Sequence, residues 1–140
     1  MNDLFAIIKQ GMQLEEIEIV NYSPLTLAYI GDAVYELVIR SIVVDEANRS
    51  VNKLHKESAN LVKADTQAKI ILALMDELDE TEIAVYKRGR NAKSYTKAKN
   101  ATYADYRNAT GFEALIGYLY LSENSERMME LINLGLEKIK

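Results

Sequence analysis

The sequence predicts an all-α protein with a single domain. Three observations predict this class: apolar residues recur at helical spacing along most of the chain, no segment alternates apolar and polar residues for long enough to form a strand, and only one proline and six glycines interrupt the pattern. At 140 residues with 49% hydrophobic residues, the chain has the size and composition of one folded core. We therefore expect one helical domain spanning residues 1–140, a helical bundle, with 1–22 as an N-terminal helical extension.

Helical segments are expected, in chain order, over residues 3–10, 24–44, 51–78, 81–89, 101–121 and 126–140. Ser23 can cap the second of them, and Pro24 suits its first turn. Ser50 can cap the third, which exceeds the usual length of a globular helix and is therefore expected to break near Ala64. Gly89 is expected to cap the end of the fourth. The second and fifth are apolar on nearly all sides, which predicts central, buried positions, and the last is amphipathic.

Composition and the pattern of apolar stretches exclude several protein classes. The chain has no cysteine, which excludes disulfide-stapled secreted domains and cysteine-bound zinc sites. Residues 1–16 lack the basic, apolar and small-residue regions of a signal peptide. No apolar stretch reaches the roughly 20 uninterrupted residues that a membrane span needs. We therefore expect a cytoplasmic protein without a membrane segment.

Positive charge is concentrated in one segment of an otherwise acidic chain. The net charge is −4, yet residues 87–99 hold six basic residues and no acidic one. Subtracting these six charges leaves −10 for the rest. Such clustering is typical of a surface that binds a polyanion such as nucleic acid. A solvated loop that only aids solubility is the other interpretation of the same pattern.

Two acidic residues, Asp32 and Glu113, lie within strongly apolar segments. An ionised carboxylate in such surroundings is costly unless it is paired, hydrogen-bonded or bound to a metal. Two of them meeting across packed helices would suit a divalent cation, and Mg²⁺ fits a site of few carboxylates and several waters. Alternatively, each acid is a buried partner of Arg40, Arg107 or a backbone donor. Glu36 and Arg40, four residues apart on the face that carries Asp32, favour this second interpretation.

Glycines accompany both acids. Gly31 precedes Asp32, and Gly117 lies one turn beyond Glu113. Glycine inside a helix costs about 1 kcal/mol relative to alanine, so its presence in both helices needs a compensating reason. We expect the two backbones to approach each other closely near the carboxylates.

The segments around these two acids resemble the sequence motifs of a known family. YIGDAVYELVI, at 29–39, resembles the signature helix of ribonuclease III, and FEALIGYLYL, at 112–121, resembles the second motif of that family's nuclease domain. The likeness spans about Leu25 to the C-terminus. Because 140 residues leave no room for the double-stranded-RNA-binding domain of full-length ribonuclease III, the chain resembles the short form, mini-ribonuclease III. LHKESANLVKADTQAKI (54–70) and KRGRNAKS (87–94) are similar to the same short form.

The resemblance implies an activity and a set of partners. The activity is that of an endoribonuclease that hydrolyses double-stranded RNA with carboxylate-bound Mg²⁺ and an activated water, leaving 5′-phosphate ends. Mn²⁺ is a candidate substitute for Mg²⁺. The implied substrate is a precursor of large-subunit ribosomal RNA, and the implied assembly is a homodimer. A ribosomal protein is a further candidate partner.

Position by position, the resemblance assigns metal binding and catalysis to Asp32 and Glu113, which match acidic metal ligands of the family. Two further acidic positions of the usual family site are occupied here by Ala28 and Thr110. The number of metal ions per site is therefore open. Either Glu36 or water is expected to take the place of the missing ligands.

Without a separate RNA-binding domain, the nuclease domain itself has to contact the RNA phosphates. The basic loop 87–100 is the candidate, since arginine presents forked donors to phosphate and A-form RNA is recognised through phosphates and 2′-hydroxyls. The residues expected to contact RNA are Lys87, Arg88, Arg90, Asn91, Lys93, Ser94, Lys97, Lys99 and His55. For His55, the only histidine, a structural role is the alternative.

Two other functions are consistent with the sequence. The acids missing at Ala28 and Thr110 would suit a catalytically inactive module that binds structured RNA or a ribosomal particle. A helical interaction protein that binds no nucleic acid is the second alternative, if the charged loop is only solvated. Retention of both Asp32 and Glu113 favours the enzyme.

Overall fold

The computed structural model describes residues 3–46, 50–93 and 102–140, and within these ranges it contains helices and no strand. The predicted all-α class is therefore confirmed. The α-helices are α1 (Leu4–Met12), α2 (Pro24–Glu46), α3 (Val51–Val62), α4 (Ala64–Leu74), α5 (Glu80–Asn91), α6 (Tyr103–Leu121) and α7 (Ser125–Lys138). Two short 3₁₀ helices, η1 (Ile19–Asn21) and η2 (Met75–Glu77), precede α2 and follow α4. No helix in these ranges is long and apolar enough to cross a membrane.

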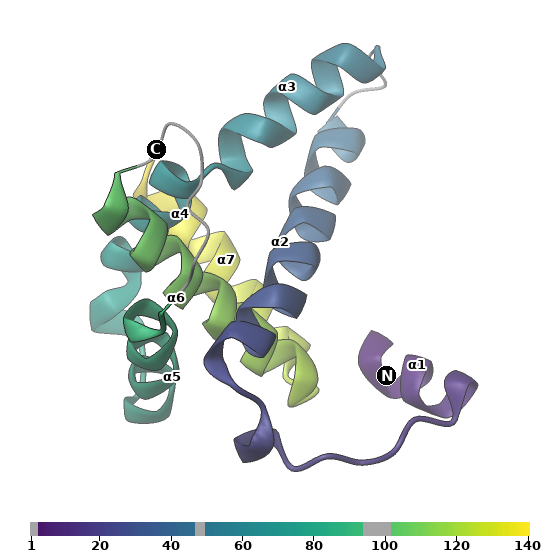
Figure 1. Ribbon diagram of the computed structural model, residues 1–140. Helices are drawn as coiled ribbons and strands as arrows, with labels where there is room; N and C mark the ends of the chain where they lie inside the picture. Colours follow the sequence, from purple (N-terminus) through teal and green to yellow (C-terminus); the bar gives the residue numbers. More distant parts are fainter. Residues whose placement is uncertain (1–2, 47–49, 94–101) are drawn as a thin grey trace.

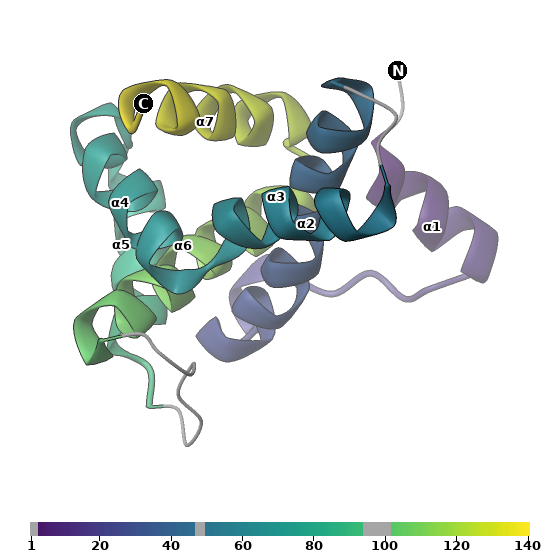
Figure 2. The same cartoon turned by 90° about the horizontal axis from the view of Figure 1, so that it is seen from above.

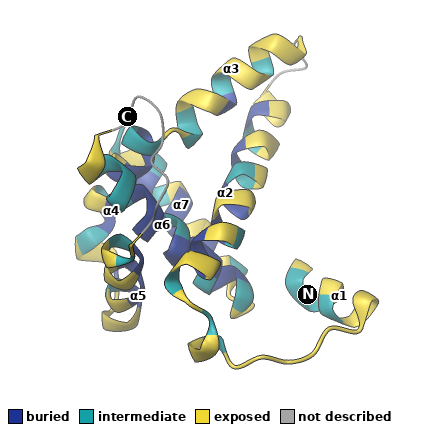
Figure 3. Ribbon diagram, in the orientation of Figure 1, coloured by how far each residue is buried: buried dark blue, intermediate teal, exposed yellow. Residues whose placement is uncertain are grey.

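The helices are organised around α6, which packs against α2, α4, α5 and α7. Figure 1 shows α2 crossing α6 near the centre of the molecule, with α5 beside it. Figure 3 shows buried residues gathered along α6 and on the sides of the helices that face it, whereas α1 and α3 are largely exposed. The expectation that the segments 24–44 and 101–121 are central thus holds, although α2 is buried on one side only.

The core is filled by aliphatic and aromatic side chains from α2, α4, α6 and α7. Tyr35, Ile70, Phe112, Leu115 and Leu131 are fully buried in it. The ring of Tyr35 meets the ring of Phe112 edge-on, with centroids 5.2 Å apart, and its hydroxyl donates to a backbone carbonyl of α3 at 2.8 Å. Burial of these side chains is the main stabilising contribution to the fold, and it holds α2 and α6 in fixed register.

The hydroxyl groups predicted to cap two helices do so. Ser23 Oγ accepts a hydrogen bond from the backbone N–H of Thr26 at 3.1 Å, and Ser50 Oγ accepts one from Lys53 at 3.4 Å. The long segment after Ser50 is broken, as expected, where the extended backbone of Lys63 separates α3 from α4.

Gly89 does not cap a helix, and that prediction is wrong. α5 continues to Asn91, and no glycine in the described residues has a positive φ. Gly89 is buried where α5 packs on α6: a Cβ at this position would lie 2.7 Å from the Ala114 Cβ and 3.0 Å from the Gly111 Cα. Close packing, not a chain reversal, requires this glycine. The expected basic loop therefore starts inside α5, and its residues 94–100 lie outside the described residues.

The N-terminal segment is tied to the end of α6. The ring of Phe5 lies 5.2 Å from the ring of Tyr120, and Lys9 Nζ contacts Glu123 Oε2 at 3.1 Å. Residues 13–18 then connect α1 to η1 without regular structure, along the lower edge of Figure 1.

Candidate active site

The two glycines beside the candidate acids lie at the crossing of α2 and α6. A Cβ at Gly31 would overlap the Glu113 carbonyl oxygen and lie 2.7 Å from the Gly117 nitrogen, and a Cβ at Gly117 would overlap the Leu27 carbonyl oxygen. The backbones of the two helices are therefore in direct contact, as the sequence predicted. This contact brings Asp32, which follows Gly31, close to Glu113, which lies one turn before Gly117.

Asp32 and Glu113 meet at this crossing, where their side chains share a hydrogen bond. Glu113 is partly buried, but Asp32 lies on the exposed side of α2, so the expectation of apolar surroundings fails for Asp32. Burial of Glu113, together with the negative charge of Asp32, raises the pKa of Glu113 to about 9. At neutral pH and without a cation, Glu113 therefore retains its proton.

The arginines considered as partners of these acids are engaged elsewhere. Arg40 Nη2 donates to Glu36 Oε1 at 2.7 Å, and Arg107 Nε donates to the Arg90 carbonyl oxygen at 3.0 Å. Within the described residues, no lysine or arginine forms an ion pair with Asp32 or Glu113. The salt-bridge interpretation of the two acids is therefore not supported.

Gln67, on the first turn of α4, is a site residue that the sequence analysis missed. Its side chain is almost fully buried and hydrogen-bonds the Glu113 carboxylate. This hydrogen bond lowers the pKa of Glu113, but burial raises that pKa by more. Its Nε2 also donates to the Val62 carbonyl oxygen at 2.7 Å, while its Oε1 is buried without a partner. The signal was present in the sequence: Gln67 shares a helix face with the buried Ile70, Ile71 and Leu74.

The residues present fit one divalent cation. Without a cation, the proton on Glu113 relieves the repulsion between the two carboxylates. A divalent cation bound to both carboxylates would replace that proton and stabilise their charged forms. Mg²⁺ in particular is commonly held by one or two carboxylates, with water and substrate oxygens completing its octahedron. In the part of the chain that the structure describes, no group of three or more acidic, histidine or cysteine side chains is placed so that it could hold a metal ion.

The two positions where the family site usually has acids contribute no ligand. Ala28 and Thr110 are both buried, and Thr110 Oγ1 donates to the Tyr106 carbonyl oxygen at 2.9 Å. Glu36, one turn after Asp32, is occupied by its ion pair with Arg40. This ion pair is exposed and therefore weak, so the choice between Glu36 and water as the replacement stays open.

The residues expected to contact RNA divide into separate groups. Lys87, Arg88, Arg90 and Asn91 lie on the last turns of α5, and Lys93 follows them as an exposed residue. Ser94, Lys97 and Lys99 lie outside the described residues. His55 is exposed on α3, where it lines a shallow hollow with Arg40 and Leu54 instead of joining the basic end of α5.

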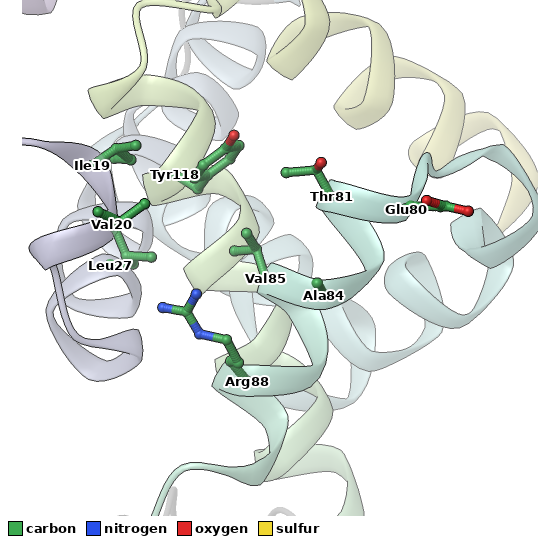
Figure 4. Close-up of a pocket in the computed structure, with 9 residues that line it drawn as sticks. All are labelled: Ile19, Val20, Leu27, Glu80, Thr81, Ala84, Val85, Arg88 and Tyr118. Atoms are coloured by element: carbon green, nitrogen blue, oxygen red, sulfur yellow. The ribbon is translucent and has the colours of Figure 1, made fainter.

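Arg88 and Arg90 line two different hollows. Its guanidinium lies over a hollow of about 310 Å³ between η1, α2, α5 and α6, shown in Figure 4. The apolar residues of the lining include Ile19, Val20, Leu27 and Tyr118. Arg90 lies instead over the ring of Tyr86 and faces the start of α6.

Comparisons with known proteins agree with the geometry. The family model described as Ribonuclease III domain matches residues 25–124, which include both acids and the helix crossing. A mini-ribonuclease 3 from Clostridium tetani is 50% identical over 125 residues, covering 89% of this chain and 83% of that protein. A mini-ribonuclease 3 from Streptococcus pneumoniae is 44% identical over 118 residues, covering 83% and 92%.

A solved structure has the same fold. The crystal structure of a protein from Fusobacterium nucleatum matches with a TM-score of 0.78 and 31% identity, covering 89% of this chain and 100% of that one. The chain therefore belongs to the ribonuclease III family, in its mini-ribonuclease III branch.

Proposed function

We propose that this protein is an endoribonuclease that hydrolyses double-stranded RNA at the Asp32–Glu113 pair. The observation that carries the proposal is the meeting of two carboxylates at the crossing of α2 and α6, with burial raising the pKa of Glu113 to about 9. Perturbed carboxylates of this kind are typical of catalytic sites. The similarity to relatives named mini-ribonuclease 3 supports the same activity.

The proposed cofactor is Mg²⁺, with Mn²⁺ as its substitute. When bound, such a cation supplies a water of lowered pKa and offsets negative charge on the reacting phosphate. Asp32 and Glu113 would hold the cation through their carboxylates, and Glu113 would have to give up its proton, because a cation favours the charged form. Gln67 keeps the Glu113 carboxylate aimed at Asp32 by donating to it. The products of this hydrolysis are proposed to carry 5′-phosphate ends.

The basic end of α5 is proposed to hold the RNA. Lys87, Arg90 and Lys93 belong to a segment without acidic residues that leads into α6, the helix that carries Glu113. Lysine and arginine contact phosphates irrespective of base sequence, so weak sequence preference is expected. The proposed substrate is a precursor of large-subunit ribosomal RNA, and the proposed further partner is a ribosomal protein bound to it.

A homodimer is proposed as the working assembly. α2 carries exposed large apolar side chains at Tyr29, Leu37 and Val44, which fall on one face of the helix. Exposed apolar surface of this kind on a small domain is typical of a protein interface. Because Asp32 lies on the same helix, a second copy packed on this face would hold its own site close by. Two sites in one assembly suit the cutting of both strands of a duplex.

The experiment that tests the function compares three purified proteins on one labelled RNA duplex: the native chain, Asp32→Asn, and Asp45→Asn. Asp45 is an exposed residue of the same helix, so its variant makes the same change in charge away from the site. Each is incubated with Mg²⁺, with Mn²⁺ and with chelator. We expect the native chain and Asp45→Asn to cut the duplex with either metal, and Asp32→Asn to bind it without cutting.

The other outcome would favour an inactive binding module. Ala28 and Thr110, where the family usually has acids, are the observation behind this alternative. A native protein that shifts the duplex in a gel but leaves it whole with both metals would replace the proposed enzyme by a module that binds structured RNA or a ribosomal particle.

A further inference from the structure

Two arginines from different helices face one hollow between α5 and the start of α6. Arg90 comes from the last turn of α5 and Arg107 from the second turn of α6. Together with Ala104 and Asn108 they line a hollow of about 300 Å³. Both arginines are partly buried, so their guanidinium groups are held by the fold and do not extend freely into solvent.

The two guanidinium groups are fixed in place by neutral oxygens. Arg107 Nε donates to the Arg90 carbonyl oxygen at 3.0 Å, and Arg107 Nη2 donates to Asn91 Oδ1 at 3.0 Å. Arg90 Nε donates to the same Asn91 oxygen at 3.2 Å. Arg90 also lies over the ring of Tyr86, and Arg107 over the ring of Tyr103. Within the described residues, these contacts use the Nε side of each arginine and leave further Nη donors for a ligand.

The positive charges of this pair are not neutralised by the surrounding protein. Within the described residues, neither Arg90 nor Arg107 forms an ion pair with a carboxylate. The sequence from 87 to 104, which joins the two helices, contains no aspartate or glutamate at all. Two like charges held side by side repel each other, and an anion between them removes that cost.

We propose that Arg90 and Arg107 together bind one backbone phosphate of the RNA duplex, a phosphate close to the bond being cut but distinct from it. The inference rests on the proposed function. Arg107 precedes Glu113 by six residues, which places it about 9 Å further along the axis of α6. The forked donors of arginine match the oxygens of a phosphate, and two forks from different helices set the position and direction of one strand.

The test measures how binding depends on salt. Arg90→Gln, Arg107→Gln and the double variant are made in the Asp32→Asn chain, which is expected to bind a labelled RNA duplex without cutting it. Lys138→Gln is the control, because it removes one positive charge from α7, which Figure 2 shows on the side of the fold away from the start of α6. Affinity is measured across a potassium chloride series, with the thermal unfolding midpoint of each variant.

Each single variant is expected to bind about tenfold more weakly, and to reduce by about 1 the slope of log affinity against log salt. The double variant is expected to lose less than the sum of the singles, because both arginines serve one phosphate. Arg107→Lys, which keeps the charge but not the fork, is expected to keep the slope and lose affinity. Lys138→Gln is expected to have the same affinity and the same salt slope as its parent.

Two results would overturn the inference: folded Arg90→Gln and Arg107→Gln chains that bind with the affinity and slope of the parent, or a Lys138→Gln chain whose slope falls as far as those of the two glutamine variants. A native chain that cuts the duplex while Arg90→Gln and Arg107→Gln keep the parent slope would overturn only this inference. A native chain that neither binds nor cuts the duplex would overturn the proposed function as well.

Discussion

At the scale of single residues, the chemistry of the site is decided by the different surroundings of two like groups. Asp32 is exposed on α2, whereas Glu113 is partly buried on α6 and hydrogen-bonds Gln67. Burial therefore keeps the Glu113 carboxyl protonated above the usual pKa range of a glutamate. The pair can bind a cation only by losing that proton, so metal binding is coupled to pH.

We predict that the metal-free protein loses stability as pH rises between about 4.5 and about 9. These are the ordinary pKa of a glutamate and the raised pKa of Glu113 in the fold. Across this window the unfolded chain has released a proton that the folded chain still binds, so the free energy of unfolding falls with pH, by at most about 1.4 kcal/mol per pH unit for one group. Urea unfolding in the presence of chelator, repeated across this pH range, measures the free energy of unfolding. Parallel pH profiles for the native chain and Glu113→Gln would contradict the prediction.

Gln67→Leu is predicted to weaken Mg²⁺ binding by about 10–100-fold, because a residue that orients a metal ligand typically contributes this much. Loss of the hydrogen bond to the Val62 carbonyl also costs about 1–3 kcal/mol of stability. Thr66→Val is the matched control, since it removes the neighbouring buried bond to the Asn60 carbonyl without touching Glu113. Calorimetric titration with Mg²⁺ measures the metal affinity of both variants. Equal affinities would show that Gln67 contributes to packing and not to metal binding.

At the scale of helices, close backbone contact builds the site. Gly31 and Gly117 let α2 and α6 touch, and Gly89 and Gly111 let α5 approach α6. A side chain at any of these positions would push the helices apart. Each glycine costs about 1 kcal/mol of helix stability relative to alanine. The close packing that offsets this cost also places the side chains of the candidate site.

Gly31→Ala is predicted to destabilise the protein by about 1–3 kcal/mol or more, because its Cβ would overlap backbone atoms that cannot move aside cheaply. Gly11→Ala is the control: it lies in α1 with no other atom close to the added Cβ, so it is predicted to be neutral or to stabilise by up to about 1 kcal/mol. Denaturant unfolding of the two variants measures the difference. Equal free energies of unfolding would show that the crossing tolerates a Cβ.

A buried ion pair joins the N-terminus of α5 to α7. Arg127 Nε and Nη2 contact the two carboxylate oxygens of the buried Glu82 at 2.8 and 2.9 Å, and Glu82 also completes a capping box with Asp79. Hydrogen bonding to Arg127 holds the pKa of Glu82 below its ordinary value. The pair thus fixes where α5 begins against the C-terminal helix.

Arg127→Met is predicted to cost about 1–3 kcal/mol, because it leaves the Glu82 carboxylate buried without its partner. Adding Glu82→Gln to Arg127→Met removes the unpaired charge and is predicted to restore part of the loss. Thermal unfolding of the two single variants and the double variant measures the coupling. Additive losses would show that the two side chains act independently.

At the scale of the whole molecule, the apolar face of α2 that holds Tyr29, Leu37 and Val44 is the candidate contact between two copies. Leu37→Glu is predicted to shift a dimer to monomers, because a carboxylate would be buried against the same face of the partner. Leu72→Glu, which places the same charge on an exposed leucine of α4, is the control. Sedimentation of the native chain and both variants measures the assembly. A native chain that sediments as a monomer would contradict the proposed dimer.

The sequence predicted much of the fold because its signals are local. Helical periodicity, the caps at Ser23 and Ser50 and the break near Ala64 each depend on a few neighbouring residues, and each is confirmed. The prediction for Gly89 failed because a glycine that ends a helix and one that admits a neighbouring helix look the same in the sequence. Only the packing of α5 on α6 distinguishes the two.

The sequence by itself determined the all-helical class, the family motifs and the identity of the two acids, since these depend on residue type and spacing alone. The tertiary structure decided which acid is buried, that Gln67 hydrogen-bonds Glu113, and that Arg90 and Arg107 face one hollow. The physical reason is that pKa values and ligand geometry arise from contacts between α2, α4, α5 and α6, residues far apart along the chain. The glycines predicted that α2 and α6 approach each other, but local patterns do not specify which side chains are buried or paired where the helices meet.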